Sequence, residues 1–317
     1  MAARKTVALA LGSGSSRGWA HIGVLEALAG ENISIDCIVG SSIGSYVGAL
    51  YACDKLSSLK EFVLRMDGKK VFSYFDVVFP RSGLLDGTKR LKELFSMHTD
   101  VEDFSELNLQ VVMVATDLNT GGKVVLKSGS LFDALRATMS IPGLFAPACI
   151  NKRWLVDGGL VDPVPVGIAR AMSADIVIGV DLNSGLVSRK RKQIAGGQAI
   201  RSVCEAHEPK HDFIGKMAAY YETAETGLKT KINELLHRES LTPDIFETVT
   251  SSIHIMQERI TRINLAVEPP DVLVQPRLGQ LKMLDFDQVD QVIEEGYLAV
   301  KEKRADILAL LEPAADN

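Results

Sequence analysis

Ser42 lies in a five-residue motif that can present a serine hydroxyl as a nucleophile. Residues 40–44, Gly-Ser-Ser-Ile-Gly, follow an apolar run at 35–39 and precede a helical pattern at 46–51. This motif, placed between a strand and a helix, holds its serine on a sharp turn, where Gly40 and Gly44 avoid collisions with neighbouring backbone. The helix that follows directs its N-terminal dipole toward a developing negative charge. Ser42 is therefore the candidate nucleophile, although a plain Gly/Ser loop fits these five residues equally well.

A glycine-rich turn is the candidate oxyanion hole. Residues 12–18, Gly-Ser-Gly-Ser-Ser-Arg-Gly, follow the apolar run at 7–11. Loops at the carboxyl ends of neighbouring parallel strands converge, and amides of such a turn can point at one oxygen. A dinucleotide loop has similar spacing but expects an acidic residue at the end of the second strand, whereas Asp36 lies near its beginning. We expect the hole to be formed by the amides of Gly12, Ser13, Gly14 and Ser15.

Asp157 is the candidate base. It follows a short apolar run at 154–156 and precedes Gly158 and Gly159, which allow close approach of the backbone. A serine nucleophile needs an adjacent proton acceptor, and a carboxylate in a loop beside the sheet can serve. An ordinary Asp-Gly turn is an equally good interpretation of Asp157 taken alone.

A histidine base and a metal ion are the alternatives. Four histidines follow Asp157 in the order of a Ser-Asp-His triad, but Ser42 follows only the second strand, whereas a triad hydrolase places its serine after several. We expect these four to be surface or helix-face residues and His21 to be structural. Residues 285–290 begin like a calcium loop but lack its ligand pattern, so we expect no metal and no cofactor. The four histidines are His207, His211, His237 and His254.

The elements that must position these residues are short β-branched runs alternating with helical patterns, which predicts a parallel sheet covered by helices. We predict a core over residues 5–183, a helical insertion over 184–265, and a strand and C-terminal helix over 266–317 that complete the core. Strands are expected at 7–11, 35–39, 111–115, 123–126, 154–156, 176–180 and 272–274.

The predicted insertion carries one apolar helix face and one basic cluster. We favour packing of this face against the core or against a second subunit, as in a homo-oligomer. Contact of the face with a membrane is the alternative. The basic cluster, Arg189 to Lys192, is a possible peripheral contact with anionic membrane, although a solvated loop is the favoured interpretation. The apolar face consists of Phe246, Val249, Ile253, Met256, Ile260 and Ile263.

Composition narrows the class of protein. A net charge of −5 over 317 residues provides no basic field to hold nucleic acid. The four cysteines are widely spaced without a C-x-x-C pair, which is typical of reduced thiols in a cytosolic protein. The longest uncharged run is interrupted by glycines and serines, so we expect no transmembrane segment. We expect a cytoplasmic location, with the inner membrane face as the candidate site of peripheral association.

Taken together, these motifs resemble the patatin-like phospholipase family, particularly its bacterial branch related to the neuropathy target esterase catalytic domain. The glycine loop continues into residues 19–25, Trp-Ala-His-Ile-Gly-Val-Leu, as in that family, and the Ser42 and Asp157 motifs follow in the family's order. The block at 140–147 and the Asp-Pro-Val-Pro at 162–165 also resemble it. The resemblance covers about residues 6–183.

The resemblance implies a three-layer α/β/α fold and a Ser42-Asp157 dyad that hydrolyses acyl esters of phospholipids, lysophospholipids or simpler molecules without histidine or calcium. Arg17 would either contact a lipid phosphate or brace the glycine loop. Ser13 stands where many members have glycine, which bears on loop geometry rather than on chemistry. The alternative is a membrane-associating regulator that binds acyl lipids with little turnover.

Overall fold

The computed structural model describes residues 4–65, 88–184, 245–278 and 288–312 of the 317. Its contacts divide the chain into one compact unit, Met1–Leu186 with Thr250–Asn317, and a second, Val187–Val249. The fold described below is that of the first unit. The boundaries predicted from the sequence, with an insertion over 184–265, stay a prediction.

Eight strands of the described residues form one mixed sheet in the order β5-β6-β3-β2-β1-β7-β8, with β4 pairing with β3. The pairs β1-β2, β2-β3, β1-β7 and β7-β8 are parallel, and the remaining pairs are antiparallel. The predicted α/β class is therefore confirmed. The strands are β1 Val7–Leu11, β2 Cys37–Ser41, β3 Gln110–Asp117, β4 Lys123–Leu126, β5 Ala148–Ile150, β6 Arg153–Asp157, β7 Ile176–Val180 and β8 Val272–Val274.

Helices connect and cover these strands. Among those described, none is at once long enough and apolar enough to cross a bilayer. The α-helices are α1 Ala20–Gly30, α2 Ile43–Ala52, α3 Leu56–Leu64, α5 Thr88–Ser96, α6 Leu131–Thr138, α7 Val166–Ala171, α12 Ile245–Val267, α13 Val289–Glu302 and α14 Arg304–Leu311. The 3-10 helices are η1 Ser15–Trp19, η3 Phe104–Glu106 and η4 Gly158–Leu160.

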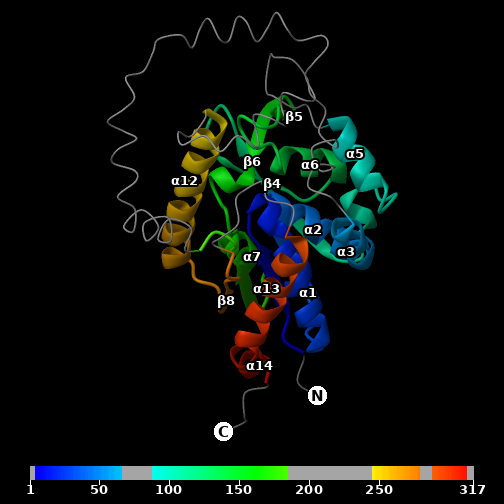
Figure 1. The fold of residues 1–317 in the computed structure, drawn as a ribbon, viewed down its shortest axis with the longest axis vertical. Coiled ribbons are helices and arrows are strands. Elements are labelled where there is room, and N and C mark those ends of the chain that lie inside the picture. The colour runs from blue at the N-terminus through cyan, green and yellow to red at the C-terminus, as the bar shows by residue number, and fades with distance from the viewer. Residues whose placement is uncertain (1–3, 66–87, 185–244, 279–287, 313–317) are drawn as a thin grey trace, which may run out of the picture. The chain divides into compact units, whose positions relative to one another are not determined.

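The central strands are apolar on both faces because helices cover both. Val7 and Leu9 of β1 belong to a core cluster with α1, α2 and α13, whereas Ala8 and Ala10 belong to one with α7. This alternation follows the two-residue period of a strand. On the first face α1 and α13 lie side by side (Figure 1), where a Cβ atom at Gly23 of α1 would lie 1.9 Å from the Ile293 carbonyl oxygen. The predicted three layers are present.

Helix α12 buries only part of the predicted apolar face. Of the predicted apolar face Ile253 is buried, but Met256 is 49% exposed and Ile263 is 63% exposed. The buried positions are mostly polar, namely Thr250, Gln257, Glu258 and Thr261. Periodicity identifies an apolar face but not which positions the rest of the fold covers, and here the covered positions are mostly polar.

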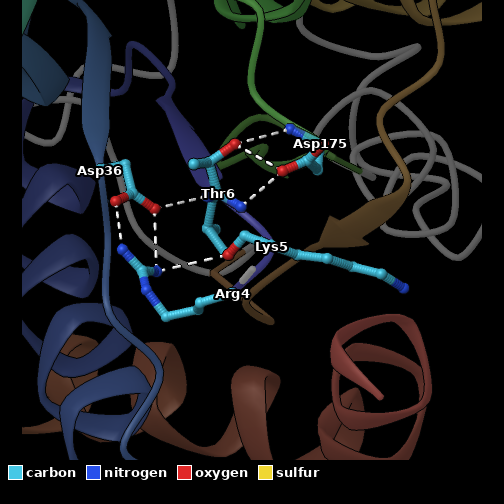
Figure 2. A network of polar contacts seen from close by, with 6 residues as sticks. Arg4, Lys5, Thr6, Asp36 and Asp175 are labelled. Atoms are coloured by element: carbon cyan, nitrogen blue, oxygen red, sulfur yellow. Dashed lines mark hydrogen bonds and ion pairs between the residues drawn. The ribbon is translucent and has the colours of Figure 1, made fainter. Parts of the chain in front are cut away.

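A network of polar contacts secures the amino ends of the central strands (Figure 2). Asp36, directly before β2, accepts hydrogen bonds from the Val7 amide at 2.7 Å and from the Arg4 guanidinium. Asp175, directly before β7, accepts from the Thr6 amide at 2.7 Å and the Thr6 hydroxyl at 2.8 Å. The start of β1 is thereby tied to the loops that lead into both of its neighbours.

Candidate active site

Ser42 lies on a strained turn between β2 and α2. Its backbone has φ 56° and ψ −125°, a region that costs a non-glycine residue about 1–3 kcal/mol. A Cβ atom at Gly40 would lie 2.5 Å from Ser45 Cα, and one at Gly44 would lie 2.3 Å from the Leu11 carbonyl oxygen. Only glycine fits at either position, so both glycines bring the strand, the turn and the helix close enough to form this turn.

Asp157, the last residue of β6, contacts the Ser42 side chain. Ser42 Oγ donates to Asp157 Oδ2 at 2.5 Å, and the Gly159 amide donates to Asp157 Oδ1 at 2.7 Å. Ser42 is 4% exposed and Asp157 is 2% exposed. The Asp157 amide donates to the Ser140 carbonyl oxygen at 2.9 Å, which anchors the aspartate to the block at 140–147. Residues 115 positions apart in the chain are thus brought into hydrogen-bond contact.

Burial changes the acidity of Asp157. Desolvation raises the pKa of its carboxyl to about 6, although the hydrogen bonds from Ser42 and Gly159 favour the charged form. A base works best when its pKa lies near the operating pH. The sequence pattern alone did not indicate this burial. A carboxylate with this pKa is mostly ionised at pH 7 and can accept a proton.

The four amides at the start of the glycine loop after β1 differ in whether they already donate a hydrogen bond. The Gly12 amide donates to the Val180 carbonyl oxygen at 3.1 Å, and the Ser13 amide donates to that of Pro163 at 2.8 Å. Within the described residues, the Gly14 and Ser15 amides make no such bond. Ser15 has φ 50° and begins η1. The predicted set of four amide donors is therefore divided, because the first two already bind carbonyl oxygens of the fold.

Two buried side chains brace this loop. Arg17 is 0% exposed, and its Nε donates to the Gly14 carbonyl oxygen at 3.2 Å. Desolvation lowers the pKa of Arg17 to about 10, opposed by attraction to Asp181. His21 Nε2 donates to the Gly12 carbonyl oxygen at 2.8 Å, and burial lowers the pKa of His21 to about 4. These contacts favour bracing over a phosphate contact for Arg17 and agree with a structural His21.

Three residues that the sequence did not single out contact the turn of Ser42, the glycine loop or the loop after Asp157. The Ser42 amide donates to Thr138 Oγ1 at 2.9 Å, so α6 holds the turn of the candidate nucleophile. Asn183 Nδ2 donates to the Ser13 carbonyl oxygen at 3.0 Å. A Cβ atom at Gly159 would lie 2.5 Å from Gln257 Nε2 of α12. Asn183 follows β7 closely, so the rule that loops at strand carboxyl ends converge was a usable signal.

The remaining predicted residues are placed as follows. A Cβ atom at Gly158 would lie 2.1 Å from the Val114 carbonyl oxygen, so only glycine fits there. His254 lies on α12 near Arg17, and neither Ser42 nor Asp157 has a hydrogen bond with it. Among the described residues no group of three or more potential ligands is arranged to hold a metal ion. His207, His211, His237, the basic cluster Arg189 to Lys192 and residues 285–287 lie outside the described residues.

Similarity to known proteins covers most of the chain. An uncharacterized NTE family protein of Mycobacterium tuberculosis is 29% identical over 320 residues, which covers 92% of this chain and 89% of that protein. The human patatin-like phospholipase domain-containing protein 6 is 35% identical over 185 residues, or 56% of this chain and 13% of that protein. The lysophospholipase NTE1 of Coccidioides immitis is 35% identical over 187 residues, 57% of this chain and 12% of its own.

Among solved structures, VipD from Legionella pneumophila aligns with 94% of this chain and 66% of its own, with 13% identity and a TM-score of 0.46. The model of the family described as patatin-like phospholipase matches residues 9–170, which contain the glycine loop, Ser42 and Asp157. The chain belongs to the patatin-like phospholipase family.

Proposed function

We propose that this protein is a serine hydrolase that cleaves acyl esters of lipids, with Ser42 as nucleophile and Asp157 as base. The observation that carries the proposal is the buried 2.5 Å hydrogen bond from Ser42 Oγ to a carboxylate whose pKa is raised to about 6. Family membership and the lysophospholipase relatives support lipid esters as the substrate class.

In the proposed reaction Asp157 Oδ2 accepts the Ser42 hydroxyl proton while Ser42 Oγ attacks the ester carbonyl carbon. The tetrahedral intermediate collapses to an acyl-enzyme, and the departing alcohol takes the proton back from Asp157. Water then attacks the acyl-enzyme and gives its proton to Asp157, which returns it to Ser42 Oγ as the fatty acid leaves. One carboxyl group therefore serves as base and acid in both halves.

The oxyanion hole is best assigned to the amides of Gly14 and Ser15. Of the four predicted donors, Gly12 and Ser13 use their N–H groups on carbonyl oxygens of the fold. The dipole of α2, which begins directly after Ser42, favours negative charge at the same place. Preorganised donors of this kind are typically worth about 10²–10³ in kcat each.

Contact with an anionic membrane remains a prediction. Its predicted residues, Arg189 to Lys192, lie outside the described part of the chain, as does most of the segment predicted to mediate a homo-oligomer. Replacing all four by Gln should weaken binding to anionic vesicles and spare turnover of a soluble short-chain ester. Unchanged vesicle binding at low salt would exclude this contact.

The proposed function is tested by turnover on a panel of phospholipid, lysophospholipid and short-chain acyl esters. We expect fatty acid release by the wild-type protein and none above background by Ser42→Ala. If the wild-type protein binds acyl lipid vesicles but releases no fatty acid from any ester, the chain is a lipid-binding regulator. If Ser42→Ala retains turnover, the nucleophile is another residue.

A further inference from the structure

Among its described residues, helix α12 buries more polar than apolar side chains. Its buried face contains Thr250, Gln257, Glu258 and Thr261, while Met256 and Ile263 of its exposed face are about half exposed or more. A surface helix normally buries its apolar side chains and exposes its polar ones. Burying polar groups is unfavourable unless they find partners. One polar contact of α12 runs from Asn264 Nδ2 to Asp162 Oδ1 at 3.3 Å.

Contacts of α12 reach both loops of the active site. His254 Nε2 lies 3.0 Å from Arg17 Nη2, in the glycine loop. Three residues further along, Gln257 Nε2 packs against Gly159, the residue whose amide binds Asp157 Oδ1. The polar face of α12 thus lies against the loop that supplies the proposed oxyanion donors and against the loop that holds the base.

The contact between His254 and Arg17 has only one possible direction. A guanidinium carries donors and no acceptor, so Arg17 Nη2 donates and His254 Nε2 accepts. His254 Nε2 therefore carries no proton in this arrangement, and the imidazole is neutral. The same nitrogen is unavailable to accept the Ser42 proton, which excludes His254 as the base in this arrangement.

Arg17, which donates to His254, also holds the peptide group between Gly14 and Ser15. Its Nε donates to the Gly14 carbonyl oxygen at 3.2 Å, and its amide donates to the same oxygen at 3.2 Å. The Gly14 carbonyl and the Ser15 amide belong to one planar peptide unit and point in opposite directions. Fixing the Gly14 oxygen therefore fixes the direction of the Ser15 N–H, one of the two proposed oxyanion donors.

We propose that His254 is a positioning residue for the active site: by accepting from Arg17 it fixes the Gly14–Ser15 peptide and so the direction of the Ser15 N–H. This inference rests on the proposed hydrolase function. His254 acts through Arg17 and takes no proton from Ser42. The contribution is expected in the transition state, where the oxyanion forms, and not in substrate binding.

The test compares three His254 variants on a soluble short-chain ester. His254→Ala and His254→Leu remove the acceptor, and leucine keeps more of the side-chain volume. His254→Gln places an amide oxygen where it can accept from Arg17. Arg259→Ala, at an exposed position on the same helix, is the matched control. Affinity for an alkyl trifluoromethyl ketone, whose serine adduct carries an oxyanion, is measured alongside kcat and KM.

We expect alanine and leucine to lower kcat about three- to tenfold with KM within about twofold, and to weaken trifluoromethyl ketone binding by the same factor. Glutamine should restore both to within about twofold of wild type, and Arg259→Ala should leave both unchanged.

Three outcomes overturn the proposal: kcat and ketone binding unchanged in alanine and leucine, glutamine as impaired as alanine, or failure of both alanine and leucine to fold. A loss as large as that in Asp157→Asn would make His254 the base instead. Ser42→Ala in the same assay distinguishes failure of the positioning role of His254 from failure of the proposed hydrolase function. If Ser42→Ala keeps turnover, the proposed function fails rather than the role of His254.

Discussion

The two ends of the central sheet hold aspartates with opposite surroundings. At the amino ends Asp36 is partly buried, which acts to raise its pKa, but the Arg4 guanidinium and the Val7 amide outweigh burial and lower it (Figure 2). At the carboxyl ends Asp157 is buried, and desolvation outweighs its hydrogen bonds and raises its pKa to about 6. Both aspartates lie at strand termini, yet their charges are stabilised at one end and destabilised at the other.

This difference separates a structural carboxylate, Asp36, from the proposed catalytic base, Asp157. A folded-state pKa below the unfolded value means that ionised Asp36 stabilises the fold above the unfolded pKa, an effect that is lost as the pH falls. A folded-state pKa raised from 3.8 to about 6 means that ionised Asp157 destabilises the fold at neutral pH, by about 3 kcal/mol. That cost is relieved progressively as the pH falls from about 6 to 3.8. The candidate active site thus contains a carboxylate, Asp157, whose ionised form is unfavourable and can accept a proton.

The largest expected effect is that of Asp157→Asn. Turnover should fall by at least about 10²–10⁴ because the proposed base is lost. The free energy of unfolding at pH 8 should rise by about 1–3 kcal/mol because an unfavourable buried charge is removed. Ester kinetics and urea unfolding measure the two effects. Loss of activity together with loss of stability would contradict the contrast between the two ends of the sheet.

A histidine base oriented by Asp157 would produce an equally large loss. Alanine at each of four histidines, one at a time, distinguishes the cases. We expect no variant to lose more than about tenfold in turnover, or about 1.4 kcal/mol of transition-state stabilisation. A folded histidine variant as inactive as Asp157→Asn would replace the dyad with a triad. The four residues are His207, His211, His237 and His254.

The pH dependence gives the next largest effect. Because Asp157 must be ionised to act, kcat/KM for a neutral soluble ester should fall about tenfold per pH unit below a pKa of about 6. Between pH 7 and pH 4 the expected decrease is about 10². A rate that stays constant down to pH 4.5 would show that the carboxyl is not raised in pKa or is not the base.

Gly158→Ala should have an intermediate effect. A Cβ atom there would lie 2.1 Å from the Val114 carbonyl oxygen, so the backbone must shift. We expect a loss of about 1–3 kcal/mol in the free energy of unfolding, with reduced turnover because Asp157 is adjacent. Gly30→Ala, where no atom lies within 4 Å of the added carbon, is the control and should leave both unchanged or slightly stabilise the fold. Equal stability of the two variants would argue against this packing.

The smallest expected effect lies at the amino ends of the strands. Asp36→Asn removes the ion pair with Arg4 and weakens the bond to the Val7 amide. Because Arg4 is largely exposed, we expect a loss of only about 1 kcal/mol in stability at pH 7 and turnover within about twofold of wild type. Asp36→Asn and Asp157→Asn should therefore change stability in opposite directions. A gain of stability in Asp36→Asn would contradict the contrast between the stabilising charge of Asp36 and the destabilising charge of Asp157.

Local patterns in the sequence predicted the strands well but missed features that depend on distant contacts. The β-branched runs identified the strands of the sheet except β5, a three-residue edge strand with an exposed Cys149. Asn151 and Lys152 join β5 to β6 with φ 50° and 62°, and a two-residue turn with asparagine was a usable hairpin signal. The periodicity of α12 could not show that its polar face would be buried against the active-site loops.

The same distinction between local patterns and distant contacts applies to the candidate site. Motif spacing predicted Ser42 and Asp157 as candidates but not the strand direction that brings them together. Strand β6 runs antiparallel to β3, and its register pairs Asp157 with Ala115, the residue after the Val114 that pairs with Ser41. Spacing could not show that the Gly12 and Ser13 amides are already bound, since their acceptors come from Val180 and Pro163, far along the chain. The pKa of Asp157 likewise depends on burial by several elements and is visible only in the folded chain.

Labelling with an active-site-directed fluorophosphonate tests the central claim, that a carboxylate activates Ser42, most directly. We expect the adduct to map to Ser42 alone, and the labelling rate to fall at least about 10² in Asp157→Asn at pH 8 while the protein remains folded. An adduct on another serine, or undiminished labelling of Ser42 in Asp157→Asn, would contradict the account.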